Sequence, residues 1–359
     1  MKSQKVEKPC RRRNNSRRKP TISTPTVDRI SDLPDSILCH ILSFIPTKQV
    51  VATSLLSPRW KSIWLSVLTL DLEDKTFKDF TSFQNFTFIA IFSRNITLPI
   101  LSFRFKCSNN NSLDFDFVDN FASFVMQRGI ENLNISTSTK LPSSILNCKT
   151  LKVLELENLR VEDFSHQMDL PLLESLHLNE VDFEHHEYLV KLLSSCPILE
   201  DLQLKCIRIP DFLVGKENFK SLPSLKSLYV EFSTYVSWPN RWSWLLEMLE
   251  CCSKLQHLTI QDSANEDNLY NNWKEPPKVP HCLSSELRTY CIKDYNYHFY
   301  YKKIELQFAK YILHNSKVLH TMTILNSSRI VDMNARLQMF IELSSSTWDS
   351  SYCKLLFVP

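Results

Sequence analysis

Three kinds of residue in this sequence have side chains that could do chemistry: a histidine beside a glutamate, the cysteines, and two closely spaced glutamates. His186-Glu187 begins the H-E-x-x-H pattern of zinc proteases, but Val190 stands where the second histidine is required. No two cysteines have C-x-x-C spacing, so zinc ligation by such pairs has no support. Glu155 and Glu157 alternate with leucines on a predicted strand, which places both carboxylates on its open face. We interpret them as part of a binding surface rather than as an acid–base pair.

The cysteine and glycine counts argue against several further kinds of catalytic and cofactor-binding site. The cysteines number eleven, which is odd, and the chain has no apolar run of 18 residues; this pattern predicts reduced thiols in a cytosolic or nuclear protein. Cys251-Cys252 is interpreted as a buried structural pair, and no thiol stands out as an activated nucleophile. The only glycines are Gly129 and Gly215, too few for a dinucleotide fingerprint, a phosphate-binding loop or a nucleophile elbow. We therefore expect no catalytic residue, no metal site and no cofactor.

Charge is distributed unevenly over the 359 residues. Residues 1–20 hold nine Lys/Arg and one acid, a net charge of +8, while the rest holds 33 Lys/Arg and 38 acids, a net charge of −5. Hydrophobic content of 43% and aromatic content of 11% indicate a globular body of two or three units. The chain therefore combines a mildly acidic body with a strongly basic tail.

The tail, residues 1–27, is polar, basic and interrupted by prolines, which predicts disorder. Within it, Arg11–Pro20 contains two basic clusters separated by three residues. That pattern fits a nuclear-localisation signal or a nucleic-acid contact, and it fits a merely solvated terminus equally well. Because no aromatic residue is interleaved, we do not expect a stacking platform for single strands. We expect a protein of the nucleus and/or cytoplasm that does not enter a membrane.

Residues 29–67 predict three short helices. The first starts with Pro34 at the first helical position, and Pro46 ends it. The third starts at Pro58 and carries four large apolar residues on one face: Trp60, Ile63, Trp64 and Val67. About forty residues is too short a chain to bury a core alone, and this segment holds more apolar side chains than it can hide. Either the helices dock on the rest of the chain or they form a partner-binding surface.

A leucine pattern repeats through the middle of the chain. Three full copies follow the template L-x-x-L-x-L-x-x-φ-x-φ, in which φ is an apolar residue: Leu151–Val161, Leu173–Phe183 and Leu199–Ile209. Weaker copies begin at residues 100, 130, 225 and 255. Helix-compatible sequence separates the copies, so we expect strand-plus-helix repeats stacked into a curved solenoid. Leu159, Val181 and Ile207 replace the usual Asn or Cys after the strand, which predicts an irregular solenoid. The alternative is an ordinary α/β domain with coincidental leucine spacing.

The helical segment, residues 28–74, resembles an F-box. The resemblance is carried by Leu33-Pro34, Ile41-Leu42, Ser57-Pro58-Arg59-Trp60 and Trp64. It implies docking onto a Skp-type adaptor, which in turn binds the cullin scaffold of a ubiquitin ligase. The residues that would hold the adaptor are Leu33, Pro34, Ile37, Leu38, Ile41, Leu42, Leu55, Trp60 and Trp64. Plant members usually have a basic residue where this chain has Pro58, but proline is tolerated at a helix start, so we expect the third helix to form.

The last segment, residues 273–359, resembles the FBD domain that follows F-box and leucine-rich repeats in plant proteins. The matching residues are Trp273, Pro276-Pro277, Val279-Pro280, Cys282-Leu283, Leu287, Tyr311-Ile312-Leu313, Asn315, Leu319, Met322 and Ile324. Physically, this segment predicts further strands and a helix at Gln307–Asn315, so it can continue the solenoid and cap it. The stretch Ser346–Asp349 departs from the family pattern.

Together the resemblances imply an α+β to α/β chain: a three-helix F-box, an irregular leucine-rich-repeat solenoid at residues 75–272, and an FBD-type cap. The implied function is a non-catalytic substrate-recognition subunit of an SCF-type ligase, which binds the adaptor through the F-box and presents a target protein for ubiquitination. Such a subunit acts by proximity, because holding two reactants together raises their effective concentration. The alternative is a nuclear scaffold that uses the basic tail on nucleic acid and binds it in a salt-dependent way.

Overall fold

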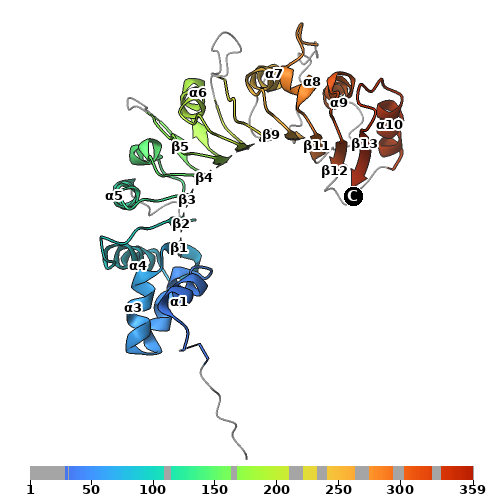
Figure 1. The fold of residues 1–359 in the computed structure, drawn as a ribbon. Coiled ribbons are helices and arrows are strands. Elements are labelled where there is room, and N and C mark those ends of the chain that lie inside the picture. Colours follow the sequence, from blue (N-terminus) through green and yellow to red (C-terminus); the bar gives the residue numbers. More distant parts are fainter. Residues whose placement is uncertain are drawn as a thin grey trace, which may run out of the picture.

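The computed structural model describes residues 29–30, 32–108, 115–162, 168–209, 221–232, 241–262, 275–293, 303–325 and 333–358. The tail predicted to be disordered and Trp273 lie outside the described residues. The described chain forms a curved solenoid, with its strands along the inner side of the arc and its helices outside (Figure 1). The N-terminal helices occupy one end of the arc and the C-terminal elements the other.

The N-terminal end is a three-helix unit, residues 32–67. Its elements are α1 (Asp35–Leu42), α2 (Thr47–Ala52), the short 3₁₀ helix η1 (Thr53–Leu55) and α3 (Pro58–Ser66). Pro34 precedes α1 rather than beginning it, and its carbonyl accepts hydrogen bonds from the N–H groups of Ile37 and Leu38. Pro58 is the first residue of α3, as predicted, because the first N–H of a helix has no intrahelical partner to lose.

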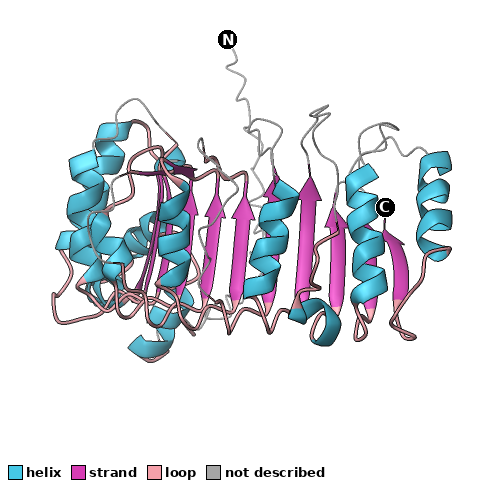
Figure 2. Cartoon of the chain, turned by 90° about the horizontal axis from the view of Figure 1, so that it is seen from above, coloured by secondary structure: helices cyan, strands magenta, loops and turns pink. Residues whose placement is uncertain are grey.

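One parallel sheet runs the length of the arc. Its eleven strands are β1 (Thr69–Glu73), β2 (Ser102–Lys106), β3 (Asn132–Ser136), β4 (Val153–Glu157), β6 (Ser175–Asn179), β8 (Asp201–Lys205), β9 (Ser227–Phe232), β10 (His257–Asp262), β11 (Thr289–Lys293), β12 (Thr321–Leu325) and β13 (Lys354–Val358). They pair in chain order, and Figure 2 shows them as a single array. The FBD-like segment therefore continues the sheet through β11, β12 and β13.

Helices cover the convex face of the sheet (Figures 1 and 2). They are α4 (Phe80–Phe92), α5 (Phe115–Met126), α6 (His186–Ser194), α7 (Arg241–Cys251), α8 (His281–Ser285), α9 (Lys303–Asn315) and α10 (Met333–Ser344), with 3₁₀ turns η2 (Asp74–Thr76) and η3 (Ser143–Asn147). Gly129 follows α5 with φ +71°, the left-handed conformation that favours glycine after a helix. The predicted strand-plus-helix repeat is confirmed.

Alternation along each strand builds the core. In β1, β2 and β4, for example, every second side chain is buried and its neighbours point to the concave side. The sheet register aligns one core-facing residue from each strand in a row: Leu70, Phe103, Leu133, Leu154, Leu176, Leu202, Leu228, Leu258, Tyr290, Met322 and Leu355. Each fully buried side chain of this size contributes about 1.5–3 kcal/mol. The row is buried from β1 to β12, whereas Leu355 is only half-buried.

Backbone turns replace the missing Asn or Cys ladder. Asn158, Glu180 and Cys206 each follow a strand with φ between 50° and 57°, and each donates its N–H to a carbonyl at the end of the next strand at 2.9–3.1 Å. The next residues, Leu159, Val181 and Ile207, are buried apolar side chains. Here a second two-stranded sheet forms between β5 (Arg160–Val161) and β7 (Asp182–Phe183). The main sheet stays in register, whereas the described connections differ in length and in whether they contain an α-helix, as between β2 and β3, or a 3₁₀ turn, as between β3 and β4.

Candidate functional site

The structure divides the nine predicted adaptor-binding residues between the inside and the outside of the three-helix unit. Four lie in its core and are at most 8% exposed: Leu38, Leu42, Trp60 and Trp64. Leu33 is half-buried against that core, and Pro34 is exposed. The other three are exposed by 45%, 48% and 88%: Ile37, Ile41 and Leu55. The four core residues present little surface to another protein, so their place in the structure is to hold the unit together.

Two further apolar residues lie on the outside and were not among the predicted contacts. Phe44 is 74% exposed and Leu56 is 68% exposed. The signal for Phe44 is its spacing, because Ile37, Ile41 and Phe44 follow i, i+4, i+7 and form a second apolar stripe beside the buried Leu38/Leu42 stripe. We call Ile37, Ile41, Phe44, Leu55 and Leu56 the exposed apolar set.

Arg59 of α3 fixes the start of α1. Its guanidinium forms an ion pair with the Asp35 carboxylate at 2.6 Å and donates to the Leu33 carbonyl. Because the Arg59 and Asp35 side chains remain 39% and 63% exposed, the ion pair itself adds little stability. Its effect is geometric, since it holds Leu33 and the first turn of α1 against α3.

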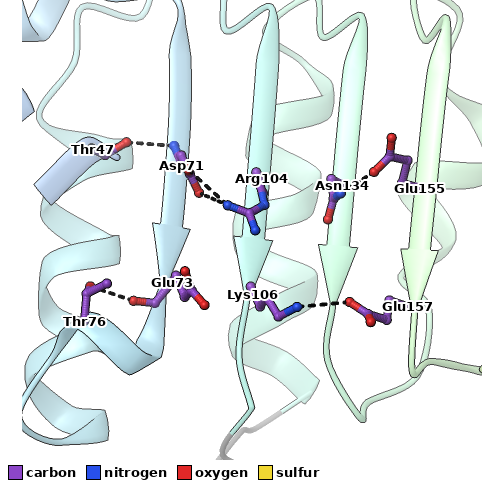
Figure 3. Close-up of polar contacts among 9 residues, drawn as sticks. All are labelled: Thr47, Asp71, Glu73, Thr76, Arg104, Lys106, Asn134, Glu155 and Glu157. Atoms are coloured by element: carbon purple, nitrogen blue, oxygen red, sulfur yellow. Dashed lines mark hydrogen bonds and ion pairs between the residues drawn. The ribbon is translucent and has the colours of Figure 1, made fainter. Parts of the chain in front are cut away.

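The three-helix unit is joined to the first strand by polar contacts. The Asp71 N–H donates to Thr47 Oγ1 at 2.7 Å, which gives a backbone donor on the edge of β1 a partner from α2 (Figure 3). Lys48 donates to the Thr76 carbonyl and lies 4.3 Å from the centroid of the Phe77 ring. These contacts tie α2 to the middle of β1 and to the end of η2.

Arg94 makes a second junction behind α3. It is 4% exposed, and its Nη1 donates to the Trp64 carbonyl in the last turn of α3 at 3.4 Å. A cation at the C-terminal end of a helix is favoured by the helix dipole. Burial, and to a smaller extent the nearby Arg128 guanidinium, lower the pKa of Arg94 to about 10. The charge is thus enclosed between the three-helix unit and the first repeat.

The concave face is polar and cross-linked between strands (Figure 3). Arg104 of β2 contacts the Asp71 carboxylate of β1 at 3.1 Å, and Asn134 of β3 donates to Glu155 of β4. Lys106 reaches Glu157 across β3 at 3.4 Å. The prediction that both glutamates of β4 face the open side is confirmed.

A histidine lies between two carboxylates at the middle of this face. His177 Nε2 is 2.7 Å from Asp201 Oδ2, and its Nδ1 is 3.6 Å from Glu155 Oε1. The hydrogen bond from His177 is the main reason that the pKa of Asp201 is lowered, with burial acting in the opposite direction. In the described part of the chain, no group of three or more His, Cys, Asp or Glu side chains could hold a metal ion. The arrangement is suited to hydrogen bonding with a polar partner.

Burial makes several thiols of the described chain unsuited to nucleophilic chemistry, because it raises their pKa. Burial raises the pKa of Cys196 and Cys282 to about 12 and raises the pKa of Cys252 well above its usual value. Cys251 is shifted in the same direction by burial and by Glu250. A protonated thiol is a poor nucleophile, so these residues behave as packing groups.

None of the described helices combines the length and the apolar character needed to cross a lipid bilayer. This finding concerns the described helices alone.

Comparison with protein families matches three segments of the chain. Residues 30–71 match the F-box domain, residues 119–214 match the leucine-rich repeats of FBD-associated F-box protein At5g56370, and residues 275–324 match the FBD domain. These segments follow one another in the same order as the three-helix unit, the repeats and the final strands.

Individual proteins of Arabidopsis thaliana are similar over most of the chain. FBD-associated F-box protein At3g52670 is 27% identical, in an alignment covering 92% of this chain and 97% of the relative. F-box/FBD/LRR-repeat protein At4g26340 is 28% identical, with coverage of 92% and 100%. F-box protein At4g09920 is 30% identical, with coverage of 72% and 94%. The similarity spans all three segments rather than one motif.

Proposed function

We propose a ligase role for this chain, which belongs to the plant F-box/FBD/LRR-repeat protein family. In this role it is the substrate-recognition subunit of an SCF-type cullin ubiquitin ligase. In this proposal the three-helix unit binds a Skp-type adaptor, the adaptor binds the cullin, and the repeat and FBD surface binds a target protein. The chain itself supplies no reacting group. It raises the effective concentration of the target near the ubiquitin-conjugating enzyme.

The observation that carries the proposal is the exposed apolar set on a unit whose core is already filled. Leu55 and Leu56 expose most of their side chains, although buried apolar residues from all three helices already form a closed cluster. Covering such a side chain with a partner is worth about 1.5–3 kcal/mol each, and only the surplus over the entropy lost on association appears as affinity. A partner with an apolar groove therefore fits this unit.

A pull-down with a recombinant Skp-type adaptor tests the contact. Ile41→Asp and Leu55→Asp place a charge on the exposed set without touching the core, and we expect each to abolish adaptor recovery. Leu172→Asp is the matched control, because Leu172 is also exposed, by 45%, but lies among the repeats. Equal recovery of the adaptor by all of these variants would exclude the proposed face.

The double variant Leu33→Ala/Pro34→Ala tests the start of α1 separately. We expect weaker adaptor binding, because Leu33 packs on the core and its carbonyl is held by Arg59. Binding unchanged from that of the intact chain would remove this segment from the interface and leave Ile41 and Leu55 to carry it.

The concave face is the proposed target-binding surface. Gln203 of β8 lies near its centre, in register between His177 of β6 and Tyr229 of β9, and its side chain is outside the apolar core. We expect Gln203→Arg to remove the target from affinity purifications analysed by mass spectrometry with the proteasome inhibited, while the adaptor is still recovered. A protein that co-purifies equally with both forms is not held by this face.

Localisation to the nucleus and/or cytoplasm is part of the proposal and depends on the basic tail. A fluorescent fusion of the full chain is expected to enter the nucleus, and substituting alanine for the basic residues of the Arg11–Pro20 stretch is expected to reduce entry. Unchanged nuclear signal would show that the tail is not a working import sequence.

A further inference from the structure

Two arginines are buried close together where the three-helix unit meets the first repeat. Arg94 follows α4 and is 4% exposed, and Arg128 follows α5 and is 8% exposed. The Arg128 guanidinium is near enough for its charge to lower the pKa of Arg94. Removing a cation from water is costly unless an anion or hydrogen-bond acceptors replace the water. Two enclosed like charges therefore need compensation from their surroundings.

The chain supplies part of that compensation through carbonyl groups. Arg128 donates through Nε and Nη2 to backbone carbonyls of residues 95–98, and Arg94 donates through Nη1 to the Trp64 carbonyl. The group that raises the pKa of Arg94 is the Cys39 thiol rather than a carboxylate. In the part of the chain that the structure describes, no acidic side chain forms an ion pair with either arginine.

The remaining nitrogens of the two guanidinium groups are buried and have no acceptor among the described residues: Arg94 Nε, Arg94 Nη2 and Arg128 Nη1. The N–H of Nε and one N–H of Nη2 point the same way in a guanidinium, and this edge binds two oxygens of one carboxylate or phosphate. In Arg94 the whole edge is unused, because its hydrogen bond is made by Nη1. Since a buried donor without an acceptor is costly, the unused edge points to a ligand.

We propose that Arg94 and Arg128 bind a small inorganic oxyanion of the phosphate class at this junction. The Arg94 edge takes two oxygens of the anion, and Arg128 Nη1 donates to the same anion. Hydrogen phosphate or sulfate balances both positive charges, whereas chloride balances one and offers the Arg94 edge a single acceptor. The ligand is a free anion, because the two side chains expose too little surface to receive a phosphate carried by a protein or a lipid.

The anion connects the two parts of the chain. Arg94 is held by the Trp64 carbonyl in the last turn of α3, and Arg128 is held at the end of α5 by the loop before β2. An anion shared by both arginines fixes the three-helix unit relative to the repeats, and thus relative to the concave face. This site is independent of the adaptor contact, so its failure would leave the proposed ligase function in place.

Phosphate binding by the full chain tests the site. The protein is dialysed to equilibrium against inorganic phosphate and denatured in acid, so that an assay of total inorganic phosphate counts anion that exchanges and anion that co-purifies. We expect a single saturable phosphate per chain, retained when alanine replaces the basic residues of the Arg11–Pro20 stretch. Sulfate is expected to displace it, and chloride at equal ionic strength is not. The proposal is overturned by no saturable binding, by binding that requires the tail, or by equal displacement with chloride.

Matched variants assign the bound phosphate to the two arginines. Arg94→Met removes the unused edge and keeps an unbranched side chain, and we expect it to hold no phosphate. Arg128→Met removes one donor and one charge, so we expect it to bind phosphate about tenfold more weakly or worse. Arg104→Met is the control, because Arg104 is paired with the Asp71 carboxylate on the concave face, and it should bind as the intact chain does. Binding by Arg94→Met equal to that of the intact chain would overturn the site.

Thermal unfolding separates an anion site from a purely structural role of Arg94. A ligand that binds only the folded chain raises the unfolding midpoint as its concentration increases. We expect phosphate to raise the midpoint of the intact chain and of Arg104→Met by more than that of Arg94→Met, whose shift measures the general effect of an excluded anion. In phosphate-free buffer, Arg94→Met should be at least as stable as the intact chain, because it lacks an uncompensated buried charge. Equal shifts in all three proteins would overturn the proposal, and Arg128→Met serves the same test where Arg94→Met does not fold.

Discussion

The two ends of the solenoid differ in what covers the sheet and in the side chains of the end strands, because β1 is polar on its concave side and β13 is largely apolar there. The β1 edge is covered by a folded unit with its own core, a hydrogen bond from Asp71 to Thr47 and a buried arginine behind α3. At the other end no strand of the described chain pairs beyond β13, whose core-facing residues Leu355 and Phe357 are half-buried. Apolar surface is thus exposed at both ends, on the covering unit at one and on the strand itself at the other, while the concave face between them is polar.

The largest expected effect comes from truncating a core side chain of the three-helix unit, which covers the β1 edge. Trp64→Ala removes a side chain that is 8% exposed from the core of the three-helix unit, and we expect it to lower the free energy of unfolding of that unit by about 3–5 kcal/mol. The free energy of unfolding is measured by chemical denaturation, with limited proteolysis between α3 and β1 used to detect the unfolded three-helix unit. Tyr352→Ala just before β13, where the side chain is 78% exposed, is the control and should change stability by about 0.5 kcal/mol or less. Comparable losses would mean that the two ends are not differently packed.

A smaller effect is expected from the hydrogen bond that finishes the β1 edge. Thr47→Val keeps the shape of a 2% exposed side chain but removes the acceptor for the Asp71 N–H, at an expected cost of about 1–3 kcal/mol. Hydrogen exchange of the Asp71 amide should accelerate in this variant. Thr323→Val on the concave side of β12 is the control, with little change expected. An Asp71 amide that exchanges equally slowly in Thr47→Val would show that α2 does not protect this edge.

The smallest effect is expected midway between the ends. His177→Ala removes the hydrogen bond that lowers the pKa of Asp201, and because both side chains are about one-third exposed or less, the expected loss is about 0.5–1 kcal/mol. A depressed carboxyl pKa stabilises the fold above the ordinary pKa of the group, and this stability is lost as pH falls through the folded-state value. The difference between the variant and the intact chain should therefore be present at neutral pH and vanish in strong acid. A difference that persists in acid would assign it to packing.

Much of the fold follows from patterns that the sequence displays directly. Leu154 and Leu156 alternate with Glu155 and Glu157, and this period of two indicates both the strand and its buried face. Pro58 and the spacing of the residues after it predict α3 correctly. These features are local, so a single stretch of sequence contains them.

What the sequence does not reveal is which apolar residues the fold covers. Trp60 and Trp64 resemble contact residues by family and by size, yet the structure places them inside the unit, because the covering side chains come from other helices. The same limit applies to Thr47, whose hydroxyl acts on a strand 24 residues away, and to Leu356, whose exposure results from the lack of a neighbouring strand among the described residues. Long-range packing decides each of these outcomes.

The left-handed residues Asn158, Glu180 and Cys206 have a consequence for how such a chain can change over evolutionary time. A solenoid joined by a buried amide ladder loses a hydrogen bond whenever a unit is duplicated or deleted out of phase. In this chain the main-chain N–H makes that bond, so any unit ending in the same turn can be spliced beside any other. Units with this turn can therefore be gained, lost or exchanged by recombination, and the polar residues of the inner surface can change without redesign of the scaffold.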